Sequence, residues 1–267
     1  DPESRCAIEV QGGHGKVSIT GEITSKQELL RSTAETLVND VYKEIGYEGK
    51  LEVEWNVVKQ SLEIASGVDK GGAGDSGIVI GYATNESPDY LPKELSFARR
   101  IARQFDSRLF EAYGPDGKIQ VSINDQGKAQ IVVASIQHKN PLYEAKKEIE
   151  EIIRNILGSE IAETGRIYIN PAGDFTIGGF AADTGSTGRK IVADQYGPRI
   201  PVGGGAFSGK DATKVDRSGA YWARKKAIEL LEETKEDEMF VTLAWAIGEP
   251  KPVMAVPQYL LQYIPTV

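Results

Sequence analysis

The stretch from Gly203 to Ser218 reads GGGAFSGKDATKVDRS and joins a glycine-rich region to a segment with helical apolar spacing. Within it, Gly204–Lys210 matches the G-x-x-x-x-G-K pattern of a phosphate-binding P-loop. Asp211, however, stands where a P-loop needs Ser or Thr to hold magnesium. The preceding Pro198–Val202 contains two prolines and does not resemble the apolar strand that a P-loop follows. These two departures exclude a Walker-type nucleotide site.

The same stretch still has the composition of an anion-binding loop. Small residues let backbone amides approach a ligand, Lys210 adds positive charge, and a helix is expected to begin directly after it. The alternative is a glycine-rich surface loop in which Asp211 caps the helix. The residues by themselves leave both interpretations open.

Two groups of charged residues accompany this loop. One follows it on the expected helix, and the other lies earlier in residues 178–209, a region that holds nine glycines. Cations interspersed with aspartates suit a polyphosphate with bound magnesium, although a single charge run is usually a solvated face. Taken together the groups favour a phosphate site, and their members are Asp183, Arg189, Lys190, Lys214, Asp216 and Arg217.

Outward from this region, the N-terminal part of the chain predicts a hairpin, a helix and a strand in that order. The hairpin strands are expected at 5–10 and 16–21 around a turn at 12–15, the helix at 26–45 and the strand at 51–57. Ser25 and Glu28 form a capping box for the helix, and Gly46 ends it. Its expected buried face consists of Leu30, Ala34, Leu37, Val41 and Ile45.

The same order occurs again later in the chain. Strands are expected at 118–123 and 129–135, a helix from Tyr143 to Gly158 and a strand at 166–169, and a partial third copy has a helix at 211–233 and a strand at 239–247. Each unit would place amphipathic helices on one face of a mainly antiparallel sheet. The sequence therefore predicts an α+β fold of three pseudo-repeated units.

Composition excludes several classes of protein. The 267 residues include 31 Lys and Arg against 39 Asp and Glu, a balance of 31 − 39 = −8 that argues against general nucleic-acid binding. One cysteine and two histidines leave no disulfide framework and no Cys/His zinc cluster. No apolar run is long enough to span a membrane, so we expect a cytoplasmic protein whose chemistry comes from charged side chains and backbone.

Two long segments, 59–77 and 178–209, fit none of the predicted units. Loops of this length in a compact fold are usually functional or disordered. We expect 59–77 to be mobile without ligand and ordered with it. His14 is interpreted as a turn residue and His138 as a polar residue at the end of a strand.

Together these segments resemble the S-adenosylmethionine synthetases, also called methionine adenosyltransferases. The longest block of the resemblance is Gly203–Ser218 itself, and the motifs run in family order along most of the chain. They are Gly-Glu-Ile-Thr at 21–24, Lys-Gln-Ser at 59–61, Gly-Ala-Gly-Asp-x-Gly at 72–77, Gly-Tyr-Ala-Thr-Asn-Glu at 81–86, Pro-Asp-x-Lys at 115–118, Gln-His at 137–138, Ile-Asn-Pro-x-Gly-x-Phe at 169–175 and Thr-Gly-Arg-Lys-Ile at 187–191.

The resemblance implies an enzyme that joins methionine to ATP, with Mg²⁺ and K⁺ as its ions. The methionine sulfur attacks the ribose C5′ carbon, the triphosphate leaves, and the enzyme cleaves it to pyrophosphate and phosphate. It also implies a homodimer, or a dimer of dimers, with sites between subunits. The resemblance further implies three structural units in the chain. They are 1–63 with 179–218 (central), 64–89 with 219–267 (C-terminal, incomplete) and 90–178 (N-terminal type).

The resemblance also assigns roles to individual residues. Lys118, Arg189, Lys190 and Lys210 match the triphosphate-binding cations, and the catalytic set is Lys118, Asp183, Arg189 and Lys210. The ATP-binding positions further include Asp75, Asp116, Phe175 and Ala206, with Phe175 beside the adenine. The methionine positions are Glu22, Gln60, Asp183 and Lys214. Glu9 matches the monovalent-cation ligand, and Asp216 an acid linked to magnesium.

Some family features differ in this sequence. The family's Gly-His-Pro-Asp-Lys motif does not occur in the 267 residues, Ala182 replaces a glycine, Val202 a histidine, and Asp174 a residue that is usually basic. We expect a compact or truncated synthetase. The alternatives are a regulatory or binding subunit with little turnover, and one half of a split synthetase.

Overall fold

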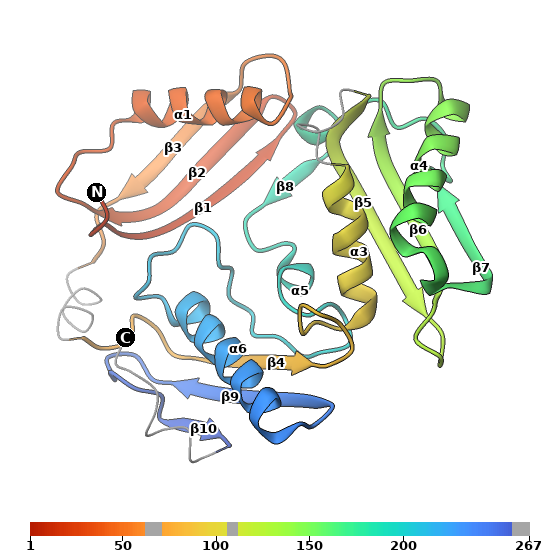
Figure 1. The fold of residues 1–267 in the computed structure, drawn as a ribbon. Coiled ribbons are helices and arrows are strands. Elements are labelled where there is room, and N and C mark those ends of the chain that lie inside the picture. Colours follow the sequence, from red (N-terminus) through yellow and green to blue (C-terminus); the bar gives the residue numbers. More distant parts are fainter. Residues whose placement is uncertain (62–70, 106–111, 258–267) are drawn as a thin grey trace.

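The computed structural model describes residues 1–61, 71–105 and 112–257, which form three β-sheets with helices against them (Figure 1). Residues 62–70, which belong to the segment expected to be mobile, lie outside the described residues. Within those described, no helix is long and apolar enough to cross a membrane.

The first sheet has four strands in the order β3-β2-β1-β8. Their bounds are β1 Arg5–Gly13, β2 Lys16–Thr24, β3 Glu52–Val58 and β8 Thr184–Ser186. The predicted hairpin is confirmed, since β1 and β2 pair antiparallel along their full length. Helix α1, Arg31–Glu44, crosses from β2 to β3 and covers one face (Figure 1). Its buried Ala34 and Tyr42 pack on Val17, Ile19 and Val53.

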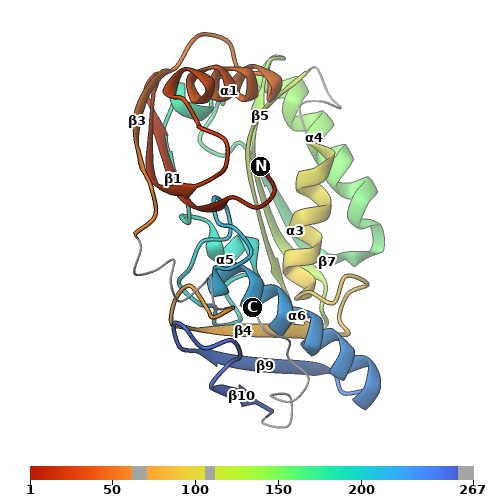
Figure 2. The same ribbon diagram turned by 90° about the vertical axis from the view of Figure 1, so that its left-hand side faces the viewer.

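The sheet that faces it across the glycine-rich segment has the order β5-β6-β7 and carries two helices. The bounds are α3 Lys93–Gln104, β5 Tyr113–Ile123, β6 Ala129–His138, α4 Leu142–Leu157, the 3₁₀ turn η1 Gly158–Glu160 and β7 Ile161–Ile169. Figure 2 shows α3 and α4 side by side on this sheet, where both contribute to one apolar core. Helix α3 was not predicted from the sequence.

These two sheets have the same connectivity, which confirms the repeated order predicted from the sequence. In each, a hairpin is followed by a helix that returns the chain to a strand parallel to the second hairpin strand. A parallel pair needs such a crossover, because a tight turn can join only antiparallel strands. The unit boundaries themselves remain a prediction.

The third sheet has the order β10-β9-β4 and is antiparallel throughout. Its strands are β4 Gly77–Thr84, β9 Glu238–Trp245 and β10 Met254–Val256, and helix α6, Val215–Thr234, covers it. Gly81 allows the close contact, since a Cβ there would lie 2.0 Å from the carbonyl carbon of Ala223 in α6. This unit repeats only part of the order found in the other two, namely a helix followed by a strand (α6 and β9).

Helix α1 differs from its prediction at its start and on its buried face. It begins at Arg31 and not at Lys26, and it has no side-chain cap. Ser25 accepts the backbone N–H of Gln27 at 3.1 Å, in a turn before the helix. Of the expected face Ala34 is buried, but Leu30, Leu37, Val41 and Ile45 are exposed, because the neighbouring stripe of Ala34, Val38 and Tyr42 packs on the sheet.

Helix α6 begins at Val215, four residues later than expected, with Lys214 at its N-cap. Asp211 does not cap it. Its carboxylate accepts the backbone N–H of Thr213 at 2.9 Å and that of Cys6 in β1 at 2.7 Å. The residue therefore ties the glycine-rich loop to the first sheet.

Residues 178–209 run between the sheets and touch all three units. The segment contains the 3₁₀ turn η2 Gly179–Ala181, the short strand β8 and helix α5 Ile191–Asp194. The carbonyl of Phe180 accepts the N–H of His14, and Thr187 donates its N–H to Val10 at 2.9 Å. At the far end, Ile8 donates to the carbonyl of Gly209 at 2.9 Å.

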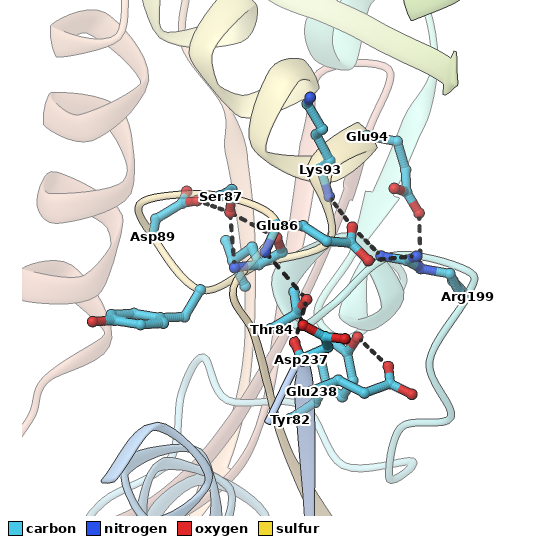
Figure 3. Close-up of polar contacts among 12 residues, drawn as sticks. Tyr82, Thr84, Glu86, Ser87, Asp89, Lys93, Glu94, Arg199, Asp237 and Glu238 are labelled. Carbon is cyan, nitrogen blue, oxygen red and sulfur yellow. Dashed lines mark hydrogen bonds and ion pairs between the residues drawn. The ribbon is translucent and has the colours of Figure 1, made fainter. Parts of the chain in front are cut away.

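Arginines fix the other side of this segment. Arg199 donates through two nitrogens to the Glu86 carboxylate, at 2.9 and 2.7 Å, and its Nε lies 3.3 Å from Glu94 of α3 (Figure 3). From α3, Arg99 donates to the carbonyls of Ala193 and Asp194, each at 2.9 Å. The contacts join the end of α5, the start of α3 and the loop after β4.

The loop after β4 is held by further polar contacts. Thr84 donates its hydroxyl to the carbonyl of Asp237 at 3.2 Å, and the buried Tyr82 donates to Glu238 at 2.7 Å (Figure 3). Burial and the hydrogen bond to Glu238 raise the pKa of Tyr82, so the phenol remains a donor at neutral pH. Arg224 of α6 donates to the carbonyl of Asp89 at 2.8 Å.

We expect Gly81→Ala to lower the free energy of unfolding by about 3 kcal/mol, because an added methyl would push α6 away from β4. Chemical denaturation measures the change. Gly204→Ala is the matched control, since a Cβ there has no neighbour within 4 Å. Equal stabilities of the two variants would contradict the packing described for Gly81.

Candidate functional site

A cavity of about 1150 Å³ lies between the β5-β6-β7 sheet and the glycine-rich segment. The start of β5 and the end of β6 form one wall, and the segment from η2 to the start of α5 forms the other. Six of the residues selected from the sequence line it: Asp116, Lys118, Phe175, Asp183, Arg189 and Lys190. The fold therefore brings together positions more than 70 residues apart in the chain.

Four cations line this cavity: Arg103 of α3 and the three that were selected from the sequence. Lys118 projects from β5, while Arg189 and Lys190 precede α5, and all three are exposed. Among the described residues, none of them has an acidic group within ion-pair distance, although Arg189 and Lys190 make long contacts to backbone carbonyls, at 3.5 and 3.4 Å. Three uncompensated charges around one cavity favour a polyanionic ligand.

Aromatic side chains complete the wall at the end nearest α1. Tyr47, Phe105, Phe175 and Phe180 line the cavity. Tyr42 stacks on Tyr47 with ring centroids 5.0 Å apart, and on Phe180 at 6.1 Å. Tyr47 and Phe180 were not selected from the sequence, because no local pattern shows that the end of α1 reaches the glycine-rich segment.

Asp116 links the two walls of the cavity. Its Oδ2 accepts the backbone N–H of Gly179 at 2.8 Å. The Tyr47 ring lies against the same glycine, where a Cβ would meet the phenol oxygen at 2.6 Å. Burial, and then the charge of Asp116, raise the pKa of Tyr47 to about 12, so it stays neutral. The carboxylate keeps Oδ1 available for a ligand.

A second, smaller cavity of about 300 Å³ lies over the other face of the first sheet. Four selected residues line it: Glu9, Glu22, Ala206 and Lys210. Gln60 is buried beside it and donates to Glu22 at 3.3 Å. The structure thus divides the selected residues between two cavities. Thr187 belongs to the small one, and Arg189, two residues on, to the large one.

The lysines near the small cavity are paired with aspartates. Lys210 Nζ lies 2.7 Å from Asp216, whose carboxylate packs on Gly205, where a Cβ would lie 2.0 Å from its Cγ. Lys214 lies 2.8 Å from Asp211, and both side chains are nearly buried. The two lysines lie four residues apart but pair with different aspartates.

Asp75 stands apart from both cavities. It is exposed, and its carboxylate accepts the N–H of the neighbouring Ser76 at 2.7 Å. Its role as a nucleoside contact therefore stays a prediction.

Neither cavity gathers a ready-made metal centre. Across residues 1–61, 71–105 and 112–257, no three His, Cys, Asp or Glu side chains come close enough to hold an ion. Glu9 and Asp216 each offer one carboxylate. Because Mg²⁺ often uses only one or two protein carboxylates and takes its other ligands from phosphates and water, Asp216 fits a metal that arrives with a polyphosphate.

Two protein-family models match the chain. Residues 70–175 match the model described as "S-adenosylmethionine synthetase, central domain", and residues 177–260 the model described as "S-adenosylmethionine synthetase, C-terminal domain". The two matches span both walls of the large cavity.

Individual proteins agree with these matches. The S-adenosylmethionine synthase of Oenococcus oeni is 40% identical, covering 95% of this chain and 72% of its own length. The S-adenosylmethionine synthase 1 of Pinus contorta is 38% identical with the same coverage. An unusual S-adenosylmethionine synthetase from Campylobacter jejuni has a similar structure, with a TM-score of 0.87 and 31% identity over 96% of this chain and 72% of that one.

The Lys214–Asp211 pair predicts an acid-sensitive contribution to stability. Burial would raise the pKa of Asp211, but hydrogen bonds from Lys214, Thr213 and Cys6 lower it to about 2. The contribution is therefore complete above the pKa of about 4 of an unfolded Asp and is lost as the pH falls toward 2.

We expect Asp211→Asn to lower the free energy of unfolding at pH 7 by about 2 kcal/mol, a value discounted for partial exposure. The difference from the unaltered chain should shrink as the pH falls through this window, as denaturant titrations at several pH values would show. Asp125→Asn, in the exposed β5–β6 turn, is the control. A pH-independent difference would contradict the assignment.

Proposed function

Because the chain belongs to the S-adenosylmethionine synthetase family, whose members are methionine adenosyltransferases, we propose that it makes S-adenosylmethionine from ATP, methionine and water and releases phosphate and pyrophosphate. One observation carries the proposal. Three cations that have no acidic partner among the described residues, together with an aromatic ring, line a cavity large enough for a nucleotide.

The large cavity is assigned to ATP. Phe175 offers an apolar face to the adenine, and Asp116 an acceptor to the nucleoside. Lys118, Arg189 and Lys190 bind the triphosphate, the part of ATP that carries most of the charge. Asp183, on the turn between η2 and β8, lies at the same cavity and contacts the reacting partners.

The reaction forms one bond and breaks one bond at the ribose C5′ carbon. A lone pair of the methionine sulfur forms the S–C5′ bond, and the electron pair of the C5′–O bond leaves with the triphosphate. No proton is transferred in this step, so no histidine base is needed. The cations stabilise the leaving oxygens, and the cavity walls hold sulfur, carbon and oxygen in line.

Methionine is assigned to the small cavity and its surroundings. Glu22, which accepts a hydrogen bond from Gln60, would bind the α-ammonium group. Lys214, which is paired with Asp211, belongs to the same set of methionine positions. Lys210 lines this cavity and would complete the phosphate site, and its partner Asp216 would hold the magnesium ion. Glu9, at the same cavity, supplies a carboxylate oxygen to a potassium-like ion.

A homodimer would unite the two groups of residues. One chain separates the cations Lys118 and Lys210 into different cavities. Two chains related by a twofold axis could place the large cavity of one against the small cavity of the other, which gives two equal sites. We propose this arrangement. The mass of the protein in solution would distinguish a dimer from a dimer of dimers.

We expect Lys118→Ala to lower kcat by a factor of about 10²–10³, because the lost contact strengthens as charge develops on the leaving oxygens. The KM for methionine should stay unchanged in steady-state kinetics. Lys147→Ala, exposed on α4 and outside both cavities, is the control. An unaltered kcat with only a higher KM for methionine would contradict the assignment of Lys118 to the triphosphate.

Steady-state kinetics together with calorimetry on the unaltered chain distinguish the proposed enzyme from its alternatives. Calorimetric binding of a non-hydrolysable ATP analogue without turnover would indicate a binding subunit or half of a split enzyme. If the chain does not bind the ATP analogue, the enzyme and its alternatives are all contradicted, and only the fold assignment stands.

Mixing two inactive variants tests the shared site. An equal mixture of Lys118→Ala and Lys210→Ala chains, after exchange of subunits, should recover about a quarter of the unaltered activity, because half of the dimers are mixed and each has one intact site. Each variant by itself should remain inactive. A mixture with no recovered activity would place both lysines in the site of a single chain.

A further inference from the structure

The Gln137–His138 pair at the end of β6 is a motif of the family resemblance that has no role in the site above. Strand β6 ends at His138, whose side chain is buried, with 1% of the residue exposed. Gln137 precedes it, and its side chain leaves the strand on the opposite side. Both side chains reach the segment that follows β7.

His138 holds both backbone polar groups of Phe175. Its own N–H donates to the Phe175 carbonyl at 2.9 Å, and its ring Nε2 accepts the Phe175 N–H at 3.1 Å. Ring Nδ1 lies 2.8 Å from the carbonyl of Asn140 and donates to it. The pattern requires a neutral ring with its proton on Nδ1, since an imidazolium has no lone pair for the Phe175 N–H.

Gln137 holds Thr176, the residue after Phe175, and Asp116 of β5. Its amide oxygen accepts the Asp116 N–H at 3.3 Å, and its amide nitrogen donates to the Thr176 carbonyl at 3.1 Å. Two glycines make room for it. A Cβ at Gly114 would lie 2.2 Å from the Gln137 amide carbon, and one at Gly178 would lie 2.6 Å from its oxygen.

The segment is anchored at a third consecutive residue of the strand. Asn170 is buried, and its side chain exchanges two hydrogen bonds with the backbone of Ile136, at 2.8 and 3.0 Å. The end of β6 therefore fixes residues 170–176 through Ile136, Gln137 and His138 in succession.

We propose that Gln137 and His138 are positioning residues for the nucleoside end of the site: His138 sets the Phe175 ring, and Gln137 sets Asp116. The inference rests on the assignment of the large cavity to ATP. The cations of that cavity do not depend on the pair, because Arg189 and Lys190 are held by the glycine-rich segment and Lys118 by β5.

Two ligands separate this role from general support of the fold. His138→Phe keeps a ring but removes both nitrogens and leaves the Phe175 N–H without its acceptor. We expect the Kd of a non-hydrolysable ATP analogue to rise about 10- to 100-fold, the cost of an unsatisfied buried donor. The Kd of inorganic tripolyphosphate should change less than about twofold. Calorimetry measures both.

Conservative variants and controls sharpen the result. His138→Gln, whose amide oxygen reaches the position of Nε2, should recover most of the affinity for the analogue. Gln137→Leu should resemble His138→Phe, whereas Gln120→Leu, exposed on β5, should bind as the unaltered chain does. An equal loss of both ligands in His138→Phe would overturn the inference.

The ring itself can be examined in the unaltered chain, independently of ligand binding and of the folding of any variant. The chain has two histidines, and His14→Asn assigns their signals. At neutral pH the ¹⁵N spectrum of His138 should show a protonated Nδ1 and an unprotonated Nε2. A proton on Nε2 would overturn the role of His138. If the unaltered chain binds neither ligand, the assignment to ATP fails, while this measurement still tests the contact between His138 and Phe175.

Discussion

The course of residues 178–209 is the constraint on which the site depends. Tyr196 and Ile200 are buried in a small apolar core with Tyr82 and Leu91, and the rest of the segment is fixed by hydrogen bonds and ion pairs. They come from all three units: β1 holds Phe180 and Thr187, α3 holds the end of α5, and Arg199 reaches back to Glu86. Each sheet thereby contributes to the position of the same loop.

The charges of the two cavities follow from how this segment is held. Arg189 and Lys190 lie where the chain passes between sheets, and in the described parts of the chain no carboxylate is near enough to neutralise them. Lys210 and Lys214 come later, where Asp216 and Asp211 already serve as partners. The large cavity is thus ready for an anion, whereas a ligand of the small cavity must compete with internal ion pairs.

The two repeated sheets illustrate how one connectivity can serve different purposes. Both use a helix to return to a parallel strand, but the β5-β6-β7 sheet is covered by α3 and α4, whereas α1 covers the first sheet on its own among the described helices. The β5-β6-β7 sheet presents Asp116 and Lys118 at the start of β5 and anchors Phe175 at the end of β6. The core under its helices keeps both ends in register.

The sequence by itself determined the repeated order of hairpin, helix and strand in two of the sheets, because apolar periodicity and turn residues act over a few neighbouring positions. It also singled out the lysines, arginines and aspartates of the site, through local motifs and a family resemblance. Local patterns could not determine which stripe of α1 is buried or where α6 begins, since Tyr42 packs with Val17 and Asp211 accepts a hydrogen bond from Cys6, both distant along the chain. Only the tertiary structure decided that Lys118 and Arg189 share a cavity while Lys210 lies in another. Contacts between residues more than 70 positions apart depend on how the sheets pack, and no short stretch of sequence carries that information.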